Sequence, residues 1–248
     1  MKFYEFGNMK ATGLVKALYT PMGIGKWGLN DPNSQESYEA LGREFTITPS
    51  DMIRTKQLHT AAVRVVGREH GGEGVIRPIT AEGFDGLITD EPGLMLCTVE
   101  ADCTPVYLLD PVHKAIAMLH SGWKGTAGRI SANAISLMEE TYGTKPEDVI
   151  AAIGPCICPN CYEVSDDLIP PFKANFTENQ VKELFTAKPN GKYWLDLKKA
   201  VRITLNDAGV SACNIEDSGY CTYHDNLFYS WRRDKNPDVR MLTAIMLN

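Results

Sequence analysis

Short apolar runs follow one another through the centre of the chain, and they constrain its fold more than any other feature. They cover residues 87–89, 94–99, 106–109 and 114–119, and they read as strands. Asp110 and Pro111 turn the chain between the last two runs. Because several of these runs are hairpin-like neighbours, they predict a mixed sheet rather than a purely parallel βαβ array.

The flanking sequence predicts helices mixed with further strands, which favours an α+β fold. We expect one domain over residues 1–248, because neither a repeat nor a linker divides the chain. A loop rich in glycine and proline is expected at residues 20–33. The expected helices cover residues 34–45, 126–142, 178–185 and 196–208, and the further strands cover residues 3–6, 12–19, 53–58, 62–66, 149–153, 227–231 and 240–247.

Composition excludes several classes of protein. The net charge is −6 and no basic block occurs, so we expect no nucleic-acid partner, although a local pocket for a small anion is compatible with this charge. No run reaches the roughly 18 apolar residues of a membrane helix. The first residues lack the apolar core of a signal peptide, so we expect a cytoplasmic protein. Its 7 cysteines then read as reduced thiols.

Three residues of metal-ligand type, His59, Cys103 and His120, each lie where a predicted strand gives way to a loop. Imidazole and thiolate are preferred zinc ligands, and three protein ligands with an open position are typical of catalytic zinc. A single histidine or cysteine more often serves packing. Two rivals stay open: a metal-free hydrolase or amidase with Cys103 as nucleophile and His120 as base, and a metal-binding protein without activity.

Several polar residues near these three are candidates for catalysis or substrate binding, each with a plainer alternative. Asp102 is a candidate to orient an imidazole or carry a proton, or it is a turn residue. Gln57 points to the same side of its strand as His59 and is a candidate to bind substrate, or it is an exposed strand residue. Lys124 in SGWKG precedes a helix and is a candidate to bind an anion, or it belongs to a simple turn.

Two further groups have less specific patterns. Arg232 and Arg233 in WRRD suit anion binding, or they blunt an edge strand. The cysteines of CICPNC resemble half of a zinc ribbon, but no partner pair or histidine near them in the sequence completes four ligands. We therefore predict that Cys156, Cys158 and Cys161 are structural thiols without a metal. Neither the H-x-E deaminase signature nor G-x-S-x-G occurs.

Taken together, the motifs resemble the YfiH-type laccase-domain family from about Lys56 to the end of the chain. The resemblance rests on KQLH, FDGLITDEPG, EADCTPVYLLDP, AIAMLHSGWKG, AAIGPCICPNCYEV and FYSWRRD. It implies a four-layer α+β sandwich of mixed sheets flanked by helices, and a metal site of His59, Cys103 and His120. It also implies phosphorolysis of adenosine, inosine, guanosine and methylthioadenosine, with deamination of adenosine. The partners would be nucleoside and phosphate, and the protein a monomer or homodimer.

One departure from the family pattern and one count of histidines limit what the resemblance implies. The segment YTPMGIGKWGLN lacks the arginine that is usual in the family, so Lys26 would have to replace it in phosphate binding. A multicopper cluster needs many imidazoles, and the 5 histidines cannot supply them. We therefore expect zinc, or copper at most as a single ion. In the expected mechanism zinc activates water for attack on C6 of adenine, while Lys124, Arg232 and Arg233 are candidates to hold phosphate.

Overall fold

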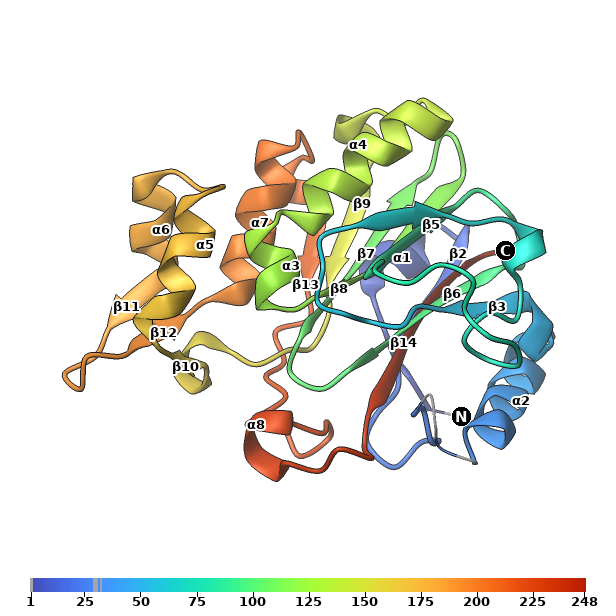
Figure 1. Cartoon of the computed structure of the whole chain (residues 1–248). Helices are drawn as coiled ribbons and strands as arrows, with labels where there is room; N and C mark the ends of the chain where they lie inside the picture. The colour runs from blue at the N-terminus through green and yellow to red at the C-terminus, as the bar shows by residue number, and fades with distance from the viewer. Residues whose placement is uncertain (1, 29–30, 32) are drawn as a thin grey trace.

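Two sheets packed face to face, with helices on their outer faces, form the body of the protein (Figure 1). The computed structural model describes residues 2–28, 31 and 33–248. Helices α4 and α7 cover one sheet, and α2 covers the other, which gives four layers. The predicted α+β sandwich of mixed sheets is therefore confirmed.

The described helices and strands are mostly short. The helices are α1 (Gly7–Ala11), α2 (Ser34–Phe45), α3 (Trp123–Ala127), α4 (Ile130–Tyr142), α5 (Ile169–Lys173), α6 (Glu178–Leu184), α7 (Leu197–Asp207) and α8 (Trp231–Asp234). The strands are β1 (Tyr4–Glu5), β2 (Val15–Tyr19), β3 (Met52–Arg54), β4 (Val63–Val65), β5 (Gly86–Thr89), β6 (Met95–Glu100), β7 (Thr104–Asp110), β8 (Ala115–Ser121), β9 (Ile150–Ile153), β10 (Glu163–Val164), β11 (Phe185–Ala187), β12 (Tyr193–Leu195), β13 (Ile215–Asp217) and β14 (Met241–Leu247).

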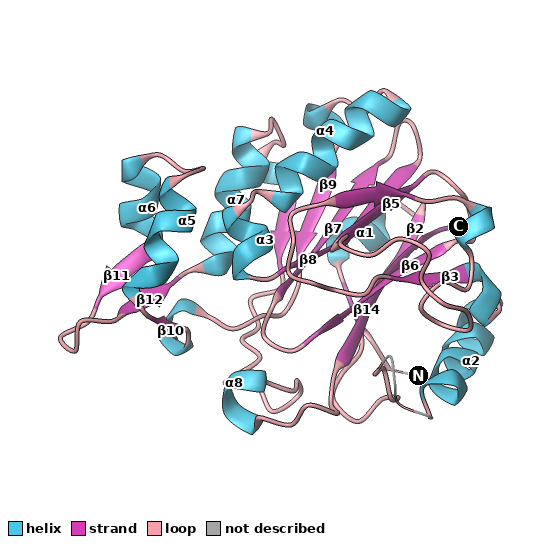
Figure 2. Cartoon of the chain, in the orientation of Figure 1, coloured by secondary structure: helices cyan, strands magenta, loops and turns pink. Residues whose placement is uncertain are grey.

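Both large sheets mix parallel and antiparallel pairs. The five-stranded sheet has the order β1-β2-β14-β6-β3, and the six-stranded sheet has the order β13-β9-β7-β8-β5-β4. Parallel pairing joins β3 to β6, β4 to β5 and β9 to β13, whereas the central pair β7 and β8 is antiparallel. A third sheet, β10-β12-β11, lies with α5 and α6 in a lobe beside α7 (Figure 2).

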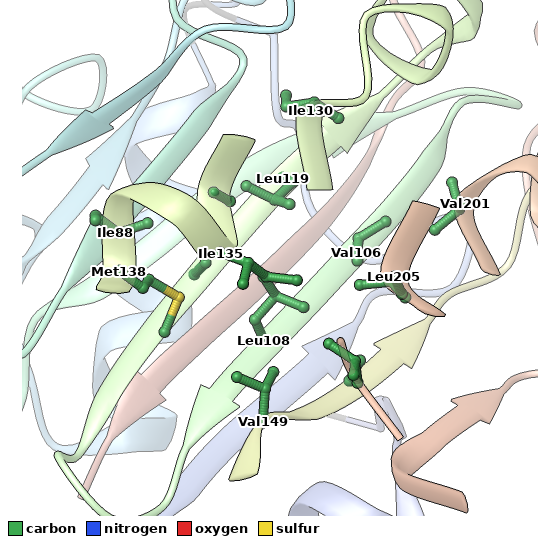
Figure 3. Close-up of a cluster of buried hydrophobic side chains, with 14 of the residues drawn as sticks. Ile88, Val106, Leu108, Leu119, Ile130, Ile135, Met138, Val149, Val201 and Leu205 are labelled. Carbon is green, nitrogen blue, oxygen red and sulfur yellow. The ribbon is translucent and has the colours of Figure 1, made fainter. Parts of the chain in front are cut away.

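The central strands read as continuous apolar runs because both of their faces are covered. In β7, Tyr107 faces the five-stranded sheet and packs in one cluster with Leu96 and Ile245. The next residue, Leu108, faces the helices and packs in another cluster with Ile135 of α4 (Figure 3). Successive side chains of a strand point to opposite faces, so a strand buried between two layers needs apolar residues at nearly every position.

Two of the places where the chain crosses between the two large sheets carry predicted metal ligands. Strand β6 belongs to the five-stranded sheet and β7 to the six-stranded sheet, so residues 101–103 form one crossing. Strand β3 belongs to the five-stranded sheet and β4 to the six-stranded sheet, so residues 55–62 form the other. His59 and Cys103 therefore sit on loops that bridge two rigid layers.

Some expected elements are wrong or incomplete. The helix expected over residues 126–142 is divided into α3 and α4, because Arg129 adopts the left-handed region at φ 59° between them. The strand expected at residues 227–231 is replaced by α8, whose first turn is capped by the hydroxyl of Ser230 accepting from Arg233 N. The strand expected at residues 53–58 ends at Arg54. The lobe sheet and β13 were not predicted.

Two further sequence expectations concern the loop at residues 20–33 and membrane-spanning helices. Leu29, Asn30 and Pro32, in the loop predicted at residues 20–33, lie outside the described residues. Within the part of the chain that the structure describes, no helix has the length and apolar character needed to cross a membrane.

Candidate functional site

His59, Cys103 and His120 converge at one end of the two sheets. One ligand-type atom from each lies within 4.8 Å of the others. In a tetrahedral zinc site with bonds of about 2.0–2.3 Å, ligand atoms are separated by about 3.3–3.8 Å. Small side-chain adjustments therefore bring all three within bonding distance of one ion, as the sequence predicts. The donor set of two imidazoles and one thiolate suits zinc.

Each of these side chains is placed by a different piece of backbone. His59 lies on the crossing loop at φ 60°, a left-handed conformation that is uncommon outside glycine. Cys103 ends the other crossing. His120 is the residue before the end of β8 and pairs with Pro105 of β7. The two imidazole rings have centroids 5.0 Å apart and planes at 77°.

Asp85 organises both histidines. Its carboxylate accepts the backbone N–H groups of Leu58, His59 and Thr60 at 2.9–3.0 Å, which holds the strained His59 turn. Its Oδ2 also lies 2.6 Å from His120 Nδ1. Burial alone would raise the pKa of Asp85, but these hydrogen bonds outweigh it and keep that pKa low. A carboxylate behind a histidine fixes the tautomer that leaves Nε2 free for a metal.

The sequence interpretation assigned no role to Asp85. The available signal was a charged residue in FDGL, directly before a fully apolar strand, where the side chain was bound to be buried. A buried carboxylate requires partners, so it is a reasonable candidate for an organising residue.

Gly122 provides the space in which the three ligands meet. A Cβ atom at this position would lie 2.9 Å from His59 Cδ2 and 3.1 Å from Cys103 Sγ. It would also lie 3.5 Å from His120 Cε1. The first glycine of SGWKG is therefore needed for close approach of side chains at the site.

Glu100 is a second buried carboxylate beside the site. Its Oε2 lies 3.7 Å from His120 Nε2 and has no hydrogen-bond partner among the described residues. Burial raises the pKa of Glu100 to about 8. Burial alone would lower the pKa of His120, but Glu100 and Cys103 outweigh it and raise that pKa well above its ordinary value. The surroundings thus favour a positive charge at His120, which a proton or a metal ion supplies.

The Asp102 carboxylate is occupied by hydrogen bonds that fix local backbone. It has φ 81°, and its carboxylate accepts hydrogen bonds from Thr222 Oγ1 at 2.6 Å, Ser230 Oγ at 3.0 Å and Arg232 N at 2.6 Å. These contacts tie the crossing loop to the C-terminal segment before β14. They match the plainer alternative, a residue that fixes local backbone, better than a proton shuttle.

The predicted substrate residues Gln57 and Lys124 are placed differently. The Gln57 amide donates to Val99 O at 2.7 Å and accepts from Val99 N at 2.8 Å, so it extends β6 like a strand partner. It still lines the cavity described below. Lys124 is exposed and its ammonium lies 5.6 Å from the Trp123 ring centroid. Lys124 is also near enough to affect His59. Burial is the main cause that lowers the pKa of His59, and the nearby His120 and Lys124 lower that pKa further.

Both predicted arginines donate to backbone carbonyls. Arg233 donates to the carbonyls of Thr222, Tyr223 and Phe228 and pairs with Asp234. Arg232 donates to Glu163 O at 2.9 Å and lies over the Tyr162 ring. Both therefore brace the C-terminal segment, and Arg233 borders a cavity of about 620 Å³ that also contains Lys26.

A cavity of about 380 Å³ opens directly over the three ligands. Besides them and Gln57, it is lined by Val99, Ala101, Trp231 and the basic residues Arg54, Lys56 and Arg240. Arg240 borders the larger cavity as well. The sequence interpretation grouped Arg240 with WRRD as a basic cluster suited to anion binding, but it missed Arg54 and Lys56, which lie at and just after β3, far from Arg240 in the sequence. Their charge makes this cavity suitable for an anion despite the acidic composition.

The prediction that no fourth ligand accompanies the CICPNC cysteines is wrong. Cys158 and Cys161 lie with Cys221 and His224, and their ligand atoms are within 4.8 Å of one another. Cys221 and His224 are distant in sequence, so counting neighbours of CICPNC did not find them. Cys156 stays outside this group and is fully buried.

Comparison with known proteins identifies the family. A family model described as "Multi-copper polyphenol oxidoreductase laccase" matches residues 7–248. The chain is 37% identical over 192 residues to "Purine nucleoside phosphorylase YlmD" of Geobacillus stearothermophilus, covering 77% of this chain and 70% of that protein. It is 33% identical over 208 residues to "Adenosine deaminase RL5" of an unknown prokaryotic organism, covering 83% and 78%.

A solved structure agrees with the sequence relatives. The "hypothetical protein YfiH" of Bacillus licheniformis superposes with a TM-score of 0.88 at 32% identity, over 94% of this chain and 93% of that one. With the family model and the curated relatives, this similarity covers nearly all of the described fold, including both crossings. The chain therefore belongs to the YfiH-type laccase-domain family.

Proposed function

We propose that the chain is a zinc-dependent purine nucleoside enzyme, which phosphorolyses adenosine, inosine, guanosine and methylthioadenosine and deaminates adenosine. One observation carries the proposal: His59, Cys103 and His120 meet at the base of an open, basic cavity. Three protein ligands leave a coordination position for water or substrate. The names of the relatives, purine nucleoside phosphorylase and adenosine deaminase, supply the reaction class.

Zinc at this site would supply Lewis acidity and lower the pKa of a coordinated water to about 7. The residues of the chain prepare the position for it. Asp85 fixes the His120 tautomer and the His59 turn, and Gly122 leaves the volume that the donor atoms need. Glu100 Oε2 is buried beside His120, and burial raises the pKa of Glu100 to about 8. Its Oε2 has no hydrogen-bond partner among the described residues, whereas its Oε1 accepts from Thr98 Oγ1 at 2.9 Å.

The basic side chains that line the cavity would bind the phosphate. Arg54 is buried and its Nε has no hydrogen-bond partner among the described residues, so it retains a donor for an oxyanion. Arg240 lies 5.5 Å from the Trp231 ring centroid, and that ring presents an apolar surface at the cavity for a purine. Positive groups that hold phosphate in line with C1′ of the ribose lower the barrier by positioning and by charge stabilisation.

One observation favours a second candidate, a metal-free cysteine hydrolase. His120 lies between Cys103 and the carboxylate of Asp85, which is the arrangement of a nucleophile, its base and an orienting acid. His59 argues against it, because a nucleophile-base pair needs no second imidazole held at an uncommon φ.

The test is a product assay on protein purified without chelator. The protein is incubated with adenosine, with and without phosphate, and adenine, inosine and hypoxanthine are resolved. The proposal expects adenine and ribose 1-phosphate only with phosphate, inosine without it, and loss of both after zinc removal. Activity that survives zinc removal but disappears on alkylation of Cys103 would establish the hydrolase instead.

A further inference from the structure

We propose that Cys158, Cys161, Cys221 and His224 form a second zinc site, closed by four protein ligands and structural in role. It is separate from the three-ligand site and independent of the proposed activity. The ligands come in two matched pairs, C-P-N-C and C-T-Y-H. In each pair two residues separate the ligands, which is the spacing that lets one turn of backbone present two donors to the same ion.

The distances between donor atoms fit a tetrahedral ion. Zinc bonds of about 2.3 Å to sulfur and 2.0 Å to nitrogen place sulfur and nitrogen about 3.5 Å apart. Cys158 Sγ lies 3.9 Å and Cys161 Sγ lies 3.8 Å from the same nitrogen, His224 Nδ1. All four ligand atoms lie within 4.8 Å of one another. Three thiolates and one imidazole in this geometry select zinc over harder cations.

The backbone around Cys158 and Cys221 also favours metal binding. Pro159 starts a single 3₁₀ turn, Pro159–Cys161, in which Cys161 N and Tyr162 N both donate to Cys158 O. In the other pair, the Asp225 carboxylate accepts from Cys221 N at 2.9 Å. Cys158 N, 63 positions away, donates to Cys221 Sγ at 3.3 Å. A backbone N–H that points at sulfur stabilises the thiolate, which is the form that binds a metal.

The two segments have little other structure to hold them together. Besides the bond from Cys158 N to Cys221 Sγ, the backbone contact described between them is an isolated β-bridge between Cys156 and Cys221, with a hydrogen bond from Thr222 N to Cys156 O at 3.1 Å. The sulfurs of Cys158 and Cys161 are half-buried, and His224 is exposed. A metal joining residues this far apart in sequence would restrict the unfolded chain much as a disulfide does.

Both segments also hold Asp102, the neighbour of Cys103. Ile157 N donates to Asp102 O at 3.1 Å, and Thr222 Oγ1 donates to Asp102 Oδ1 at 2.6 Å. Asp102 has a left-handed φ of 81°, which its own side chain does not favour strongly and which its partners therefore maintain. The second zinc would brace the crossing loop on which Cys103 sits.

The experiment counts zinc in protein purified under reducing conditions without chelator. We expect two zinc ions per chain in the unaltered protein, one in Cys103→Ala, and one in the double variant Cys161→Ser, His224→Ala. Cys213→Ser is the matched control, because this cysteine is exposed and belongs to neither group. Cobalt substituted into Cys103→Ala should give the intense thiolate-to-metal absorption of a three-sulfur site.

The double variant should also melt on the order of 5–10 °C lower, because a cross-link is lost from a domain of this size. If it fails to fold, the Cys103→Ala protein still decides the matter, since one tightly held zinc with sulfur-rich coordination must remain in it. A single zinc in the unaltered protein that disappears in Cys103→Ala would overturn the proposal. So would a Cys158–Cys161 disulfide in place of metal under the same reducing conditions.

Discussion

The described residues include two groups of metal-ligand type, and they differ in how many protein ligands they offer. His59, Cys103 and His120 leave one coordination position open beneath a basic cavity. Cys158, Cys161, Cys221 and His224 leave none. A metal with an open position can act on substrate, whereas a metal with four protein ligands can only stabilise. Ligand count therefore separates a chemical role from a structural one within the same chain.

The two groups also differ in what supports them. The three-ligand site lies between packed sheets, and the buried carboxylate of Asp85 orients the His120 imidazole and holds the backbone of His59. The four-ligand cluster lies on two loops, and its histidine is exposed. The first is organised by the fold before any metal binds. The second would itself organise its surroundings, because little secondary structure holds the loops there.

The largest expected effect comes from Cys103→Ala. Nucleoside turnover should fall on the order of 10²-fold or more, because metal activation of water supplies several kcal/mol of the barrier reduction. Thermal stability should change little, since one small side chain is removed beside an open cavity. His120→Ala should abolish turnover similarly. Turnover is measured by product formation, with Cys213→Ser as control. Full activity in Cys103→Ala would contradict both the zinc mechanism and the cysteine-nucleophile alternative.

The support from Asp85 predicts the next largest effect. Asp85→Asn should weaken zinc binding at the three-ligand site by about 10–100-fold, as loss of a carboxylate behind a ligating histidine typically does. The four-ligand cluster should keep its metal. Asp110→Asn is a matched control, because Asp110 likewise accepts His113 N at 3.0 Å and lies 2.8 Å from His113 Nδ1, but away from any cavity residue described here. Competition with a chromogenic chelator measures both affinities. Equal weakening in the two variants would show that only general stability was lost.

Gly122→Ala tests the geometry of the open site at smaller scale. The added methyl would lie 2.9 Å from a His59 carbon and 3.1 Å from Cys103 sulfur, so one of these ligands must move. We expect turnover to fall about 10-fold, because a misplacement of a few tenths of an ångström to 1 Å is costly at a catalytic site. Gly7→Ala is the control, since its Cβ would meet nothing closer than 3.5 Å. Unchanged kinetics in Gly122→Ala would mean that the ligands need not meet as closely as the structure has them.

Much of the fold could be predicted, because the apolar runs of the central strands reflect burial on both faces. Helix α2 begins and ends at the expected residues 34–45. The prediction failed where tertiary contacts override local pattern. Arg129 at φ 59° divides a helix that its sequence favours, and Ser230 caps a helical turn in an apolar segment that reads as a strand.

The candidate sites show the same contrast between what local pattern predicts and what tertiary contacts decide. Residue types and their places at strand ends identified His59, Cys103 and His120. Cys158 and Cys161 were noticed for their spacing but predicted to hold no metal, because the residues that join them lie in a loop 63 positions away and could not be assigned without the fold. Arg54 and Asp85 were missed because each is a single charged residue whose partners are distant in the sequence. Long-range pairing brings these groups together, and no periodicity in the sequence encodes it.

Lys124 gives the smallest expected effect and separates the two proposed reactions at the open site. Its ammonium is exposed and near enough to contribute to the lowered pKa of His59, yet it is not among the residues lining the cavity. An exposed charge of this kind contributes about 0.2–1 kcal/mol, so Lys124→Ala should lower kcat/KM for phosphorolysis by about 2- to 5-fold and leave deamination unchanged. The loss should shrink at high salt, because exposed charges are screened. Lys182→Ala, an exposed lysine on α6, is the control. Equal loss of both activities would remove the phosphate role and make Lys124 a general part of the site, and the phosphate would then depend on Arg54 and the other cavity cations alone.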